Sequence, residues 1–323
     1  MVKRLGLYKN DSEMLNDGIS IIICCYNSEW IIARCLDALK QQRFSTPLEW
    51  EIIVVDNACT DETTTIVGRY SKELPLRIVF EPEPGLLNAR KRGISVAKYQ
   101  YSIFCDDDNI LCPNYVYGMY QLMSSNLNIG CAGGRGVAEF MCEPDEIVYQ
   151  FLKGYAIGSQ KDLVYLYGAG ICVRTDVVKE IYNTEHFYLS GRCGNRLLAG
   201  DDTELVISIL TRGYQETCSD DLTFKHVLPA QRLKYDYLKG MLKGFGLSAP
   251  ILRAKGHAEK GRPFWYIYLT YVKCLLNVFR YGFVSFFSPK NCIWYYHYFS
   301  MINAFKYWSF ETLRKAYNSC VYR

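Results

Sequence analysis

The chain has 323 residues, and half of them are hydrophobic, which excludes a small domain that lacks a hydrophobic core. The length allows either two domains or one large domain with an appendage. Its net charge of +4 conceals an asymmetry. Residues 225–323 hold 16 Lys and Arg against 3 acidic residues, whereas the part before them holds 21 basic and 30 acidic residues. This distribution favours an anionic partner for the C-terminal third.

The 14 cysteines contain no C-x-x-C pair, which argues against a zinc knuckle or a thioredoxin-like site. Several stand in apolar runs, where free cysteine behaves as a small hydrophobe. Residues 1–18 are polar, so we expect no signal peptide and place the chain in the reducing cytosol.

Apolar runs and helical spacing alternate four times in the first third of the chain. Strands are expected at 19–25, 51–55, 76–80 and 101–105, with helices after Ser28 as N-cap and at about 60–74 and 86–98. This alternation is typical of a parallel α/β sheet covered on both faces. Ligands bind such sheets outside the carboxyl ends of the strands, where Asn27, Asp56, Glu81 and Asp106 stand. Ordinary turn chemistry is the alternative explanation for these polar residues.

Three consecutive carboxylates, Asp106, Asp107 and Asp108, follow the fourth of these strands. Because neighbouring carboxylates repel one another, we expect a cation among them, and oxygen ligands suit Mg²⁺ or Mn²⁺. A solvated acidic turn or a helix cap is the alternative. No G-x-G-x-x-G and no P-loop motif occurs, so a bound phosphate would depend on a metal and basic side chains.

Later segments offer further candidate residues. The apolar stretch 165–173 contains Gly168 and Gly170, which indicates either close approach of a substrate or a bulged strand. Asp201 and Asp202 begin a helix, where the helix dipole favours carboxylates and where one could act as a general base. His226 could be a ligand or a packing residue.

Five motifs give the chain a resemblance to a known family. They are S-I-I-I-C-C-Y-N-S-E, E-I-I-V-V-D-N-A-C-T-D, P-G-L-L-N-A-R-K-R-G, F-C-D-D-D-N and G-D-D-T-E-L. In order and spacing they resemble family 2 inverting glycosyltransferases of the GT-A fold, of the type that builds bacterial cell-surface glycans. The resemblance implies a mainly parallel sheet flanked by helices. It also implies an extension at 1–18, a GT-A domain at 19–246 and a helical, basic, aromatic region at 247–323.

The resemblance also implies residue roles and ligands. Asp202 corresponds to the catalytic base, and Asp106, Asp108 and His226 correspond to ligands of Mn²⁺ or Mg²⁺. A nucleotide-diphosphate sugar, with a UDP-sugar favoured, would be the donor, and a glycan or lipid-linked hydroxyl the acceptor. The implied donor-binding residues are Tyr26, Asn27, Glu29, Asp56, Arg90, Asp106 and Asp107. Weaker support is expected from Asp201, Gly168, Gly170 and Arg232. The Q-x-x-R-W motif of processive synthases is absent, which favours single additions.

Residues 264–310 contain 19 aromatic side chains. Charged residues interrupt them, so no uncharged run reaches the ~20 residues of a spanning helix. The stretch could pack as core or lie at a membrane interface, and the basic charge favours peripheral attachment to the cytoplasmic face. Nucleic-acid binding is not expected, because it would leave the acidic sheet edge unexplained. A nucleotidyltransferase and a non-catalytic nucleotide-sugar or membrane-binding scaffold remain as alternative functions.

Overall fold

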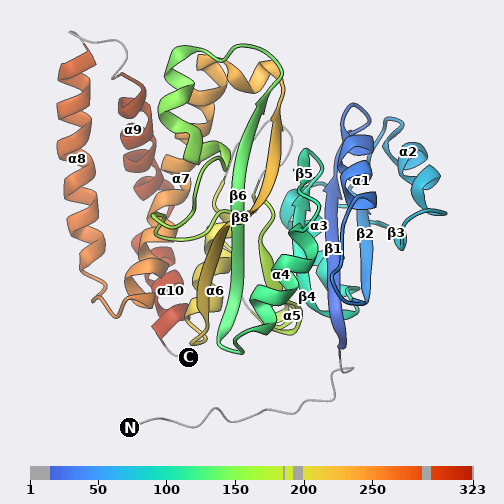
Figure 1. Cartoon of the computed structure of the whole chain (residues 1–323). Coiled ribbons are helices and arrows are strands. Elements are labelled where there is room, and N and C mark those ends of the chain that lie inside the picture. Colours follow the sequence, from blue (N-terminus) through green and yellow to red (C-terminus); the bar gives the residue numbers. More distant parts are fainter. Residues whose placement is uncertain (1–14, 185, 192–198, 286–291, 322–323) are drawn as a thin grey trace.

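The computed structural model describes residues 15–184, 186–191, 199–285 and 292–321. An eight-stranded mixed sheet forms the centre of the molecule, with the order β3-β2-β1-β4-β7-β6-β8-β5 (Figure 1). The strands are β1 (Asn16–Cys25), β2 (Trp50–Asp56), β3 (Leu76–Phe80), β4 (Tyr99–Asp106), β5 (Asn109–Leu111), β6 (Ile129–Phe140), β7 (Cys172–Arg174) and β8 (Gln215–Leu228).

The first four strands are parallel to one another, as the sequence predicts. The second half is mixed, since β7 runs antiparallel to β4 and β6, β8 runs parallel to β6, and β5 runs antiparallel to β8. The expected α/β architecture is therefore confirmed, with a mixed second half added to the parallel first half.

Six helices cover the two faces of the sheet, because apolar side chains of each strand point to both sides. On one face, α1 (Ile32–Lys40), α2 (Thr63–Tyr70) and α4 (Tyr115–Ser124) pack over Ile21 and Ile23 of β1. On the other face, α3 (Leu86–Ser95), α5 (Thr175–Thr184) and α6 (Asp201–Leu210) pack over Ile22 and Phe104. The continuous apolar strands thus lie between two helical layers.

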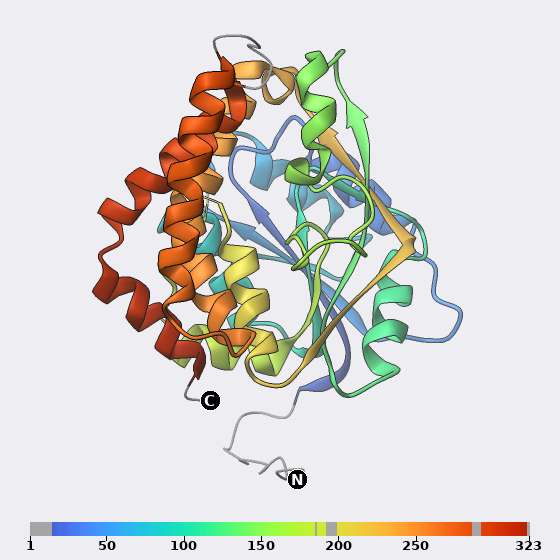
Figure 2. The ribbon, with the colours of Figure 1, turned by 90° about the vertical axis from the view of Figure 1, so that its left-hand side faces the viewer.

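A helical region covers the remaining side (Figure 2). It consists of two 3-10 segments, η1 (Glu146–Tyr155) and η2 (Ala230–Leu233), and the helices α7 (Tyr235–Glu259), α8 (Tyr266–Ser285), α9 (Cys292–Tyr307) and α10 (Phe310–Val321). The expected C-terminal helical region is therefore present. Helix α7 runs unbroken through residue 246, so the proposed boundary at that residue stays a prediction. None of the helices, over the residues described, is long and apolar enough to cross a bilayer.

One local expectation was wrong, and one of two open alternatives is excluded. Ser28 does not cap α1, which starts after Ile31, and the Ser28 hydroxyl donates a hydrogen bond to Asp107 instead. Within the apolar stretch 165–173 only the last two residues belong to a strand, β7, and the rest forms a loop. In that loop Gly170 has φ +69°, a conformation that glycine adopts at little cost.

Candidate active site

A cavity of about 820 Å³ lies between the carboxyl ends of β1 and β4 and the helices α7 and α9. It collects most of the candidate residues from the sequence. Those that line it are Tyr26, Arg90, Asp106, Asp107, Asp108, Gly168, Asp201, Asp202, His226 and Arg232. Six separate segments of the chain therefore meet at one site, as ligand binding at this edge of an α/β sheet requires.

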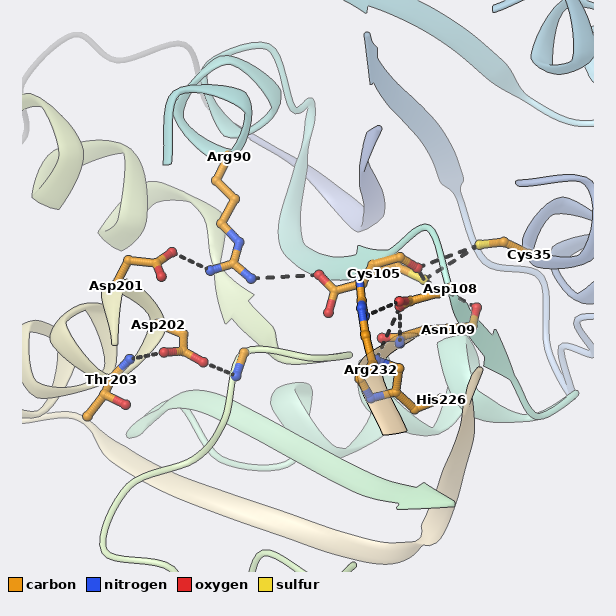
Figure 3. A network of polar contacts seen from close by, with 12 residues as sticks. Cys35, Arg90, Cys105, Asp108, Asn109, Asp201, Asp202, Thr203, His226 and Arg232 are labelled. Carbon is orange, nitrogen blue, oxygen red and sulfur yellow. Dashed lines mark hydrogen bonds and ion pairs between the residues drawn. The ribbon is translucent and has the colours of Figure 1, made fainter. Parts of the chain in front are cut away.

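Asp108 is held by basic groups from the second half of the chain (Figure 3). Its Oδ2 accepts a hydrogen bond from Nη1 of Arg232 at 2.8 Å, and its Oδ1 lies 3.4 Å from Nε2 of His226. The pairing of β5 with β8 brings them together, because it places Asn109 opposite His226. Asp108 is 3% exposed, so removing these partners would leave a buried, unpaired charge.

Asp107 shows how unfavourable three ionised carboxylates are at this point. Burial raises its pKa, and the charges of Asp108 and Asp106 raise it further, to about 7, against a lowering by the hydrogen bond from Ser28. Burial is the largest cause of this raised pKa, and the like charges of Asp108 and Asp106 add to it. The site would accept additional positive charge here.

Arg90 links the carboxylates at the end of β4 to those at the start of α6. Its guanidinium is 5% exposed and donates from Nη1 to Asp201 at 2.8 Å, while Nη2 lies 3.8 Å from Oδ1 of Asp106. Burial lowers its pKa, but the charges of Asp201 and Asp106 outweigh burial and raise the pKa above its usual value. Arg90 is therefore a permanently charged cation between the two acidic groups (Figure 3).

Two backbone N–H groups fix the carboxylate of Asp202. Its Oδ2 accepts from Gly168 at 2.7 Å, and its Oδ1 accepts from Thr203 at 2.8 Å. A Cβ atom at Gly168 would lie 2.7 Å from Cβ of Asp202. The glycine is thus needed for this close approach, and the loop sets the orientation of the carboxylate.

The donor set around Asp108 suits a divalent cation. His226 Nδ1 lies 2.7 Å from the carbonyl oxygen of Tyr155, which can only accept a hydrogen bond, so Nδ1 carries a proton and Nε2 faces Asp108. The charge of Asp108 raises the pKa of His226 even though burial lowers it. Over the described segments no three His, Cys, Asp or Glu side chains are arranged as a metal site. Mg²⁺ and Mn²⁺ commonly use one or two protein groups and complete their shell with water and substrate phosphates, so Asp108 and His226, with Asp106 nearby, fit such an ion.

Four candidate residues are not among those that line the cavity. Asn27, Glu29 and Asp56 accept hydrogen bonds from backbone N–H groups of the segment between β2 and α2, at 2.8 to 2.9 Å. Gly170 packs against Tyr115, whose hydroxyl donates to its carbonyl oxygen at 2.8 Å. Their assignment to donor or acceptor binding stays a prediction.

Comparison with known proteins identifies the first half of the chain. The family described as glycosyl transferase family 2 matches residues 20–177. The poly(ribitol-phosphate) beta-glucosyltransferase of Bacillus spizizenii is 31% identical over 157 residues, which are 44% of this chain and 24% of that protein. A poly-beta-1,6-N-acetyl-D-glucosamine synthase of Staphylococcus epidermidis is 26% identical over 132 residues, 41% of this chain and 31% of that protein. The matches thus span about a quarter to a third of these relatives.

The chain carries a family 2 glycosyltransferase domain. Solved structures agree with this fold. S. aureus TarS in complex with UDP-GlcNAc has a TM-score of 0.52 at 17% identity, covering 73% of this chain and 66% of that one. The mannosyltransferase PcManGT from Pyrobaculum calidifontis, in complex with GDP-Man and Mn²⁺, has a TM-score of 0.55 at 16% identity, covering 88% and 85%. The expected GT-A fold is therefore confirmed.

The family 2 domain match ends before α6, so Asp201, Asp202, His226 and Arg232 are contributed by the part of the chain beyond it. Further residues, which the sequence patterns did not single out, lie on the far wall of the cavity. Tyr237 and Arg253 of α7 and His297 of α9 lie there. The basic charge of this region is a general signal for an anionic ligand. It does not show which helix faces point into the cavity, because that depends on the packing of α7 on α9.

Proposed function

We propose that the protein transfers a sugar from a nucleotide-diphosphate donor to a hydroxyl group of an acceptor, with inversion at the anomeric carbon. The observation that supports this most directly is the arrangement of Asp106, Asp108 and Asp202 around one cavity next to a family 2 domain. The first two would face the donor phosphates, and the third would face the acceptor.

Asp202 is the proposed general base. Its carboxylate lines the cavity and is oriented by the N–H of Gly168, so it can remove the proton of an acceptor hydroxyl at a fixed position. The neighbouring Asp201 is neutralised by Arg90, whereas Asp202 has no salt-bridge partner among the residues that the structure describes. One base and no carboxylate nucleophile favour a single displacement, by analogy with inverting hydrolysis.

Negative charge develops on the diphosphate as the sugar–phosphate bond breaks. The positive charge of Arg90 beside Asp106 is available to stabilise it, and Arg232 lies on the other side of Asp108. A divalent cation held by Asp108, His226 and Asp106 would supply further charge neutralisation when bound.

The donor is proposed to be a UDP-sugar, because TarS in the comparison binds UDP-GlcNAc, with a GDP-sugar as the next choice after the GDP-Man complex of PcManGT. A glycan or a lipid-linked sugar is the proposed acceptor. We propose that the acceptor lies between the sheet edge and α7, because Arg90 separates Asp202 from the triplet.

A donor screen tests the proposal. UDP-, GDP- and dTDP-sugars are offered with and without Mn²⁺ or Mg²⁺, and both binding and release of the nucleoside diphosphate are measured. We expect metal-dependent binding of one donor, its loss in Asp108→Ala, and retained binding without turnover in Asp202→Asn. A general base contributes ~10²–10⁴-fold to the rate.

Asp176→Asn is the matched control. Asp176 stands in the first turn of α5 and, like Asp202, accepts from the N–H of the next residue at 2.8 Å, but it does not line the cavity. This variant should retain full turnover. Unchanged turnover in Asp202→Asn would disprove the assignment of the base, and no binding of any nucleotide sugar would favour a scaffold function.

A further inference from the structure

The outer face of α8 carries a row of exposed apolar side chains, which we call the α8 stripe. The stripe consists of Trp265, Leu269, Val272, Leu276, Phe279 and Phe283, each between 43% and 75% exposed. The members follow one another at intervals of three and four residues, so they lie on one side of the helix. Figure 1 shows α8 at the edge of the molecule farthest from β3.

The opposite face of α8 is the one that packs on the protein. Ile267 and Cys274 are buried there with Met301 and Phe305 of α9, and Tyr281 stacks on Tyr298 with ring centroids 5.5 Å apart. The stripe therefore faces away from this hydrophobic cluster. Contiguous exposed apolar surface of this kind marks an interaction site.

Charge distinguishes the possible partners of the stripe. Lys273 and Arg280 are exposed directly beside it, and residues 260–310 contain no Asp or Glu at all. If α8 paired with α8 of a second copy, these cations would flank the seam with no acidic partner to neutralise them. The interfacial region of an anionic bilayer provides both an apolar layer for the stripe and negative charge for Lys273 and Arg280.

We propose that the α8 stripe is the site at which the protein lies on an anionic lipid bilayer. Trp265 would sit at the headgroup level, where indole rings are favoured, and the aliphatic stems of Lys273 and Arg280 would run along the apolar layer.

The position of the stripe determines on which side of the cavity the bilayer would lie. Helix α8 packs on α9, and His297 of α9 lines the cavity. A bilayer in contact with α8 would thus lie on the side of the cavity formed by α7 and α9, opposite the triplet at the sheet edge. The inference goes beyond the proposed function, since lipid binding does not depend on glycosyl transfer.

Flotation with lipid vesicles tests the proposal on the full chain. Vesicles of phosphatidylcholine alone are compared with vesicles in which about one lipid in three is the anionic phosphatidylglycerol. We expect binding to the anionic vesicles only, weakening as salt is added. Leu276→Ser and Phe279→Ser should each weaken it about tenfold, because each removes a large apolar group from the bilayer. Lys273→Gln and Arg280→Gln should each weaken it about fivefold.

Leu127→Ser is the matched control, because Leu127 is 75% exposed but lies outside the α8 stripe, and this variant should bind vesicles like the wild type. Light scattering on the same samples reports self-association. Equal flotation of Leu276→Ser and wild type, or no binding to anionic vesicles, would overturn the proposal. A wild-type dimer that Leu276→Ser dissociates would assign the stripe to a second copy instead. Donor turnover without lipid, measured in parallel, reports separately on the proposed function.

Discussion

A buried ion pair holds the helix that carries Asp202, and breaking it should both destabilise the protein and slow transfer. Glu204 in the first turn of α6 accepts from Nζ of Lys255 of α7 at 2.9 Å, and both side chains are fully buried. Glu204 also accepts from the backbone N–H groups of Tyr188 and Leu189, at 3.2 and 3.0 Å. The variant Lys255→Met keeps the approximate length of the side chain and removes its charge.

The magnitude follows from the partner that is left behind. Removing one member of a buried ion pair costs about 3–5 kcal/mol, because the other charge remains without compensation. The two N–H donors still stabilise the Glu204 carboxylate, so we expect the lower end, about 3 kcal/mol in the free energy of unfolding. Glu204→Gln added to Lys255→Met removes the uncompensated charge and should recover part of this loss.

Urea denaturation followed by tryptophan fluorescence measures the change, and donor turnover measures its effect on Asp202. The control is Lys315→Met, which breaks the exposed ion pair between Lys315 and Glu311, 2.7 Å apart, and should leave the midpoint unchanged. If Lys255→Met unfolds at the wild-type midpoint, or if the double variant is less stable than the single one, the pair does not hold α6 as argued.

Three further results are expected. Gly168→Ala should lower the turnover by on the order of tenfold to hundredfold at nearly unchanged donor binding, because the new Cβ would lie 2.7 Å from Cβ of Asp202. Gly68→Ala is the control and should have no effect, because a Cβ at Gly68 has no heavy atom within 4 Å. His226→Gln should weaken Mn²⁺ binding in titration calorimetry at least tenfold, since the ring nitrogen facing Asp108 is replaced; unchanged affinity would remove His226 from the ligand set. Chelation with EDTA should abolish metal-dependent donor binding, and Mn²⁺ should restore it; donor binding that persists in EDTA would contradict a cation at the triplet.

Local sequence patterns were sufficient for the first half of the fold. The runs at 19–25 and 51–55 are strands whose apolar side chains are buried on both faces, whereas the run at 76–80 is the edge strand β3, in which only Val79 is buried; no tertiary contact had to be known to predict these strands. The polar residues at their ends follow for the same reason. Their position depends on where each apolar run stops, and this point can be located from the sequence alone.

Long-range pairing decided the features that could not be predicted. Asp108 lies beside His226 because the short strand β5, which begins at Asn109, pairs with β8. The two strands are separated by more than a hundred residues of sequence. Lys255 lies in the basic C-terminal third of the chain, yet it is fully buried because Glu204 and Ser208 face it from α6. Ser28 looks like an ordinary N-cap but donates its hydrogen bond to Asp107. In each case the partner is remote in the sequence, so local patterns carried no information about it.

The order of the strands explains why some strand ends line the cavity and others do not. From β1 the chain adds β2 and β3 on one side and then returns to place β4 on the other. Between β1 and β4 the connections therefore leave in opposite directions, and a crevice remains at this point, as in other open α/β sheets. Tyr26 after β1 and Asp106 at the end of β4 border the crevice and line the cavity, and Asn57, the residue after β2, lines it as well, whereas the side chain of Asp56 does not. A role for Asp56 in donor binding would thus require a ligand that extends from the crevice across the end of β1, as the nucleoside of a nucleotide sugar could do with its diphosphate beside Asp106.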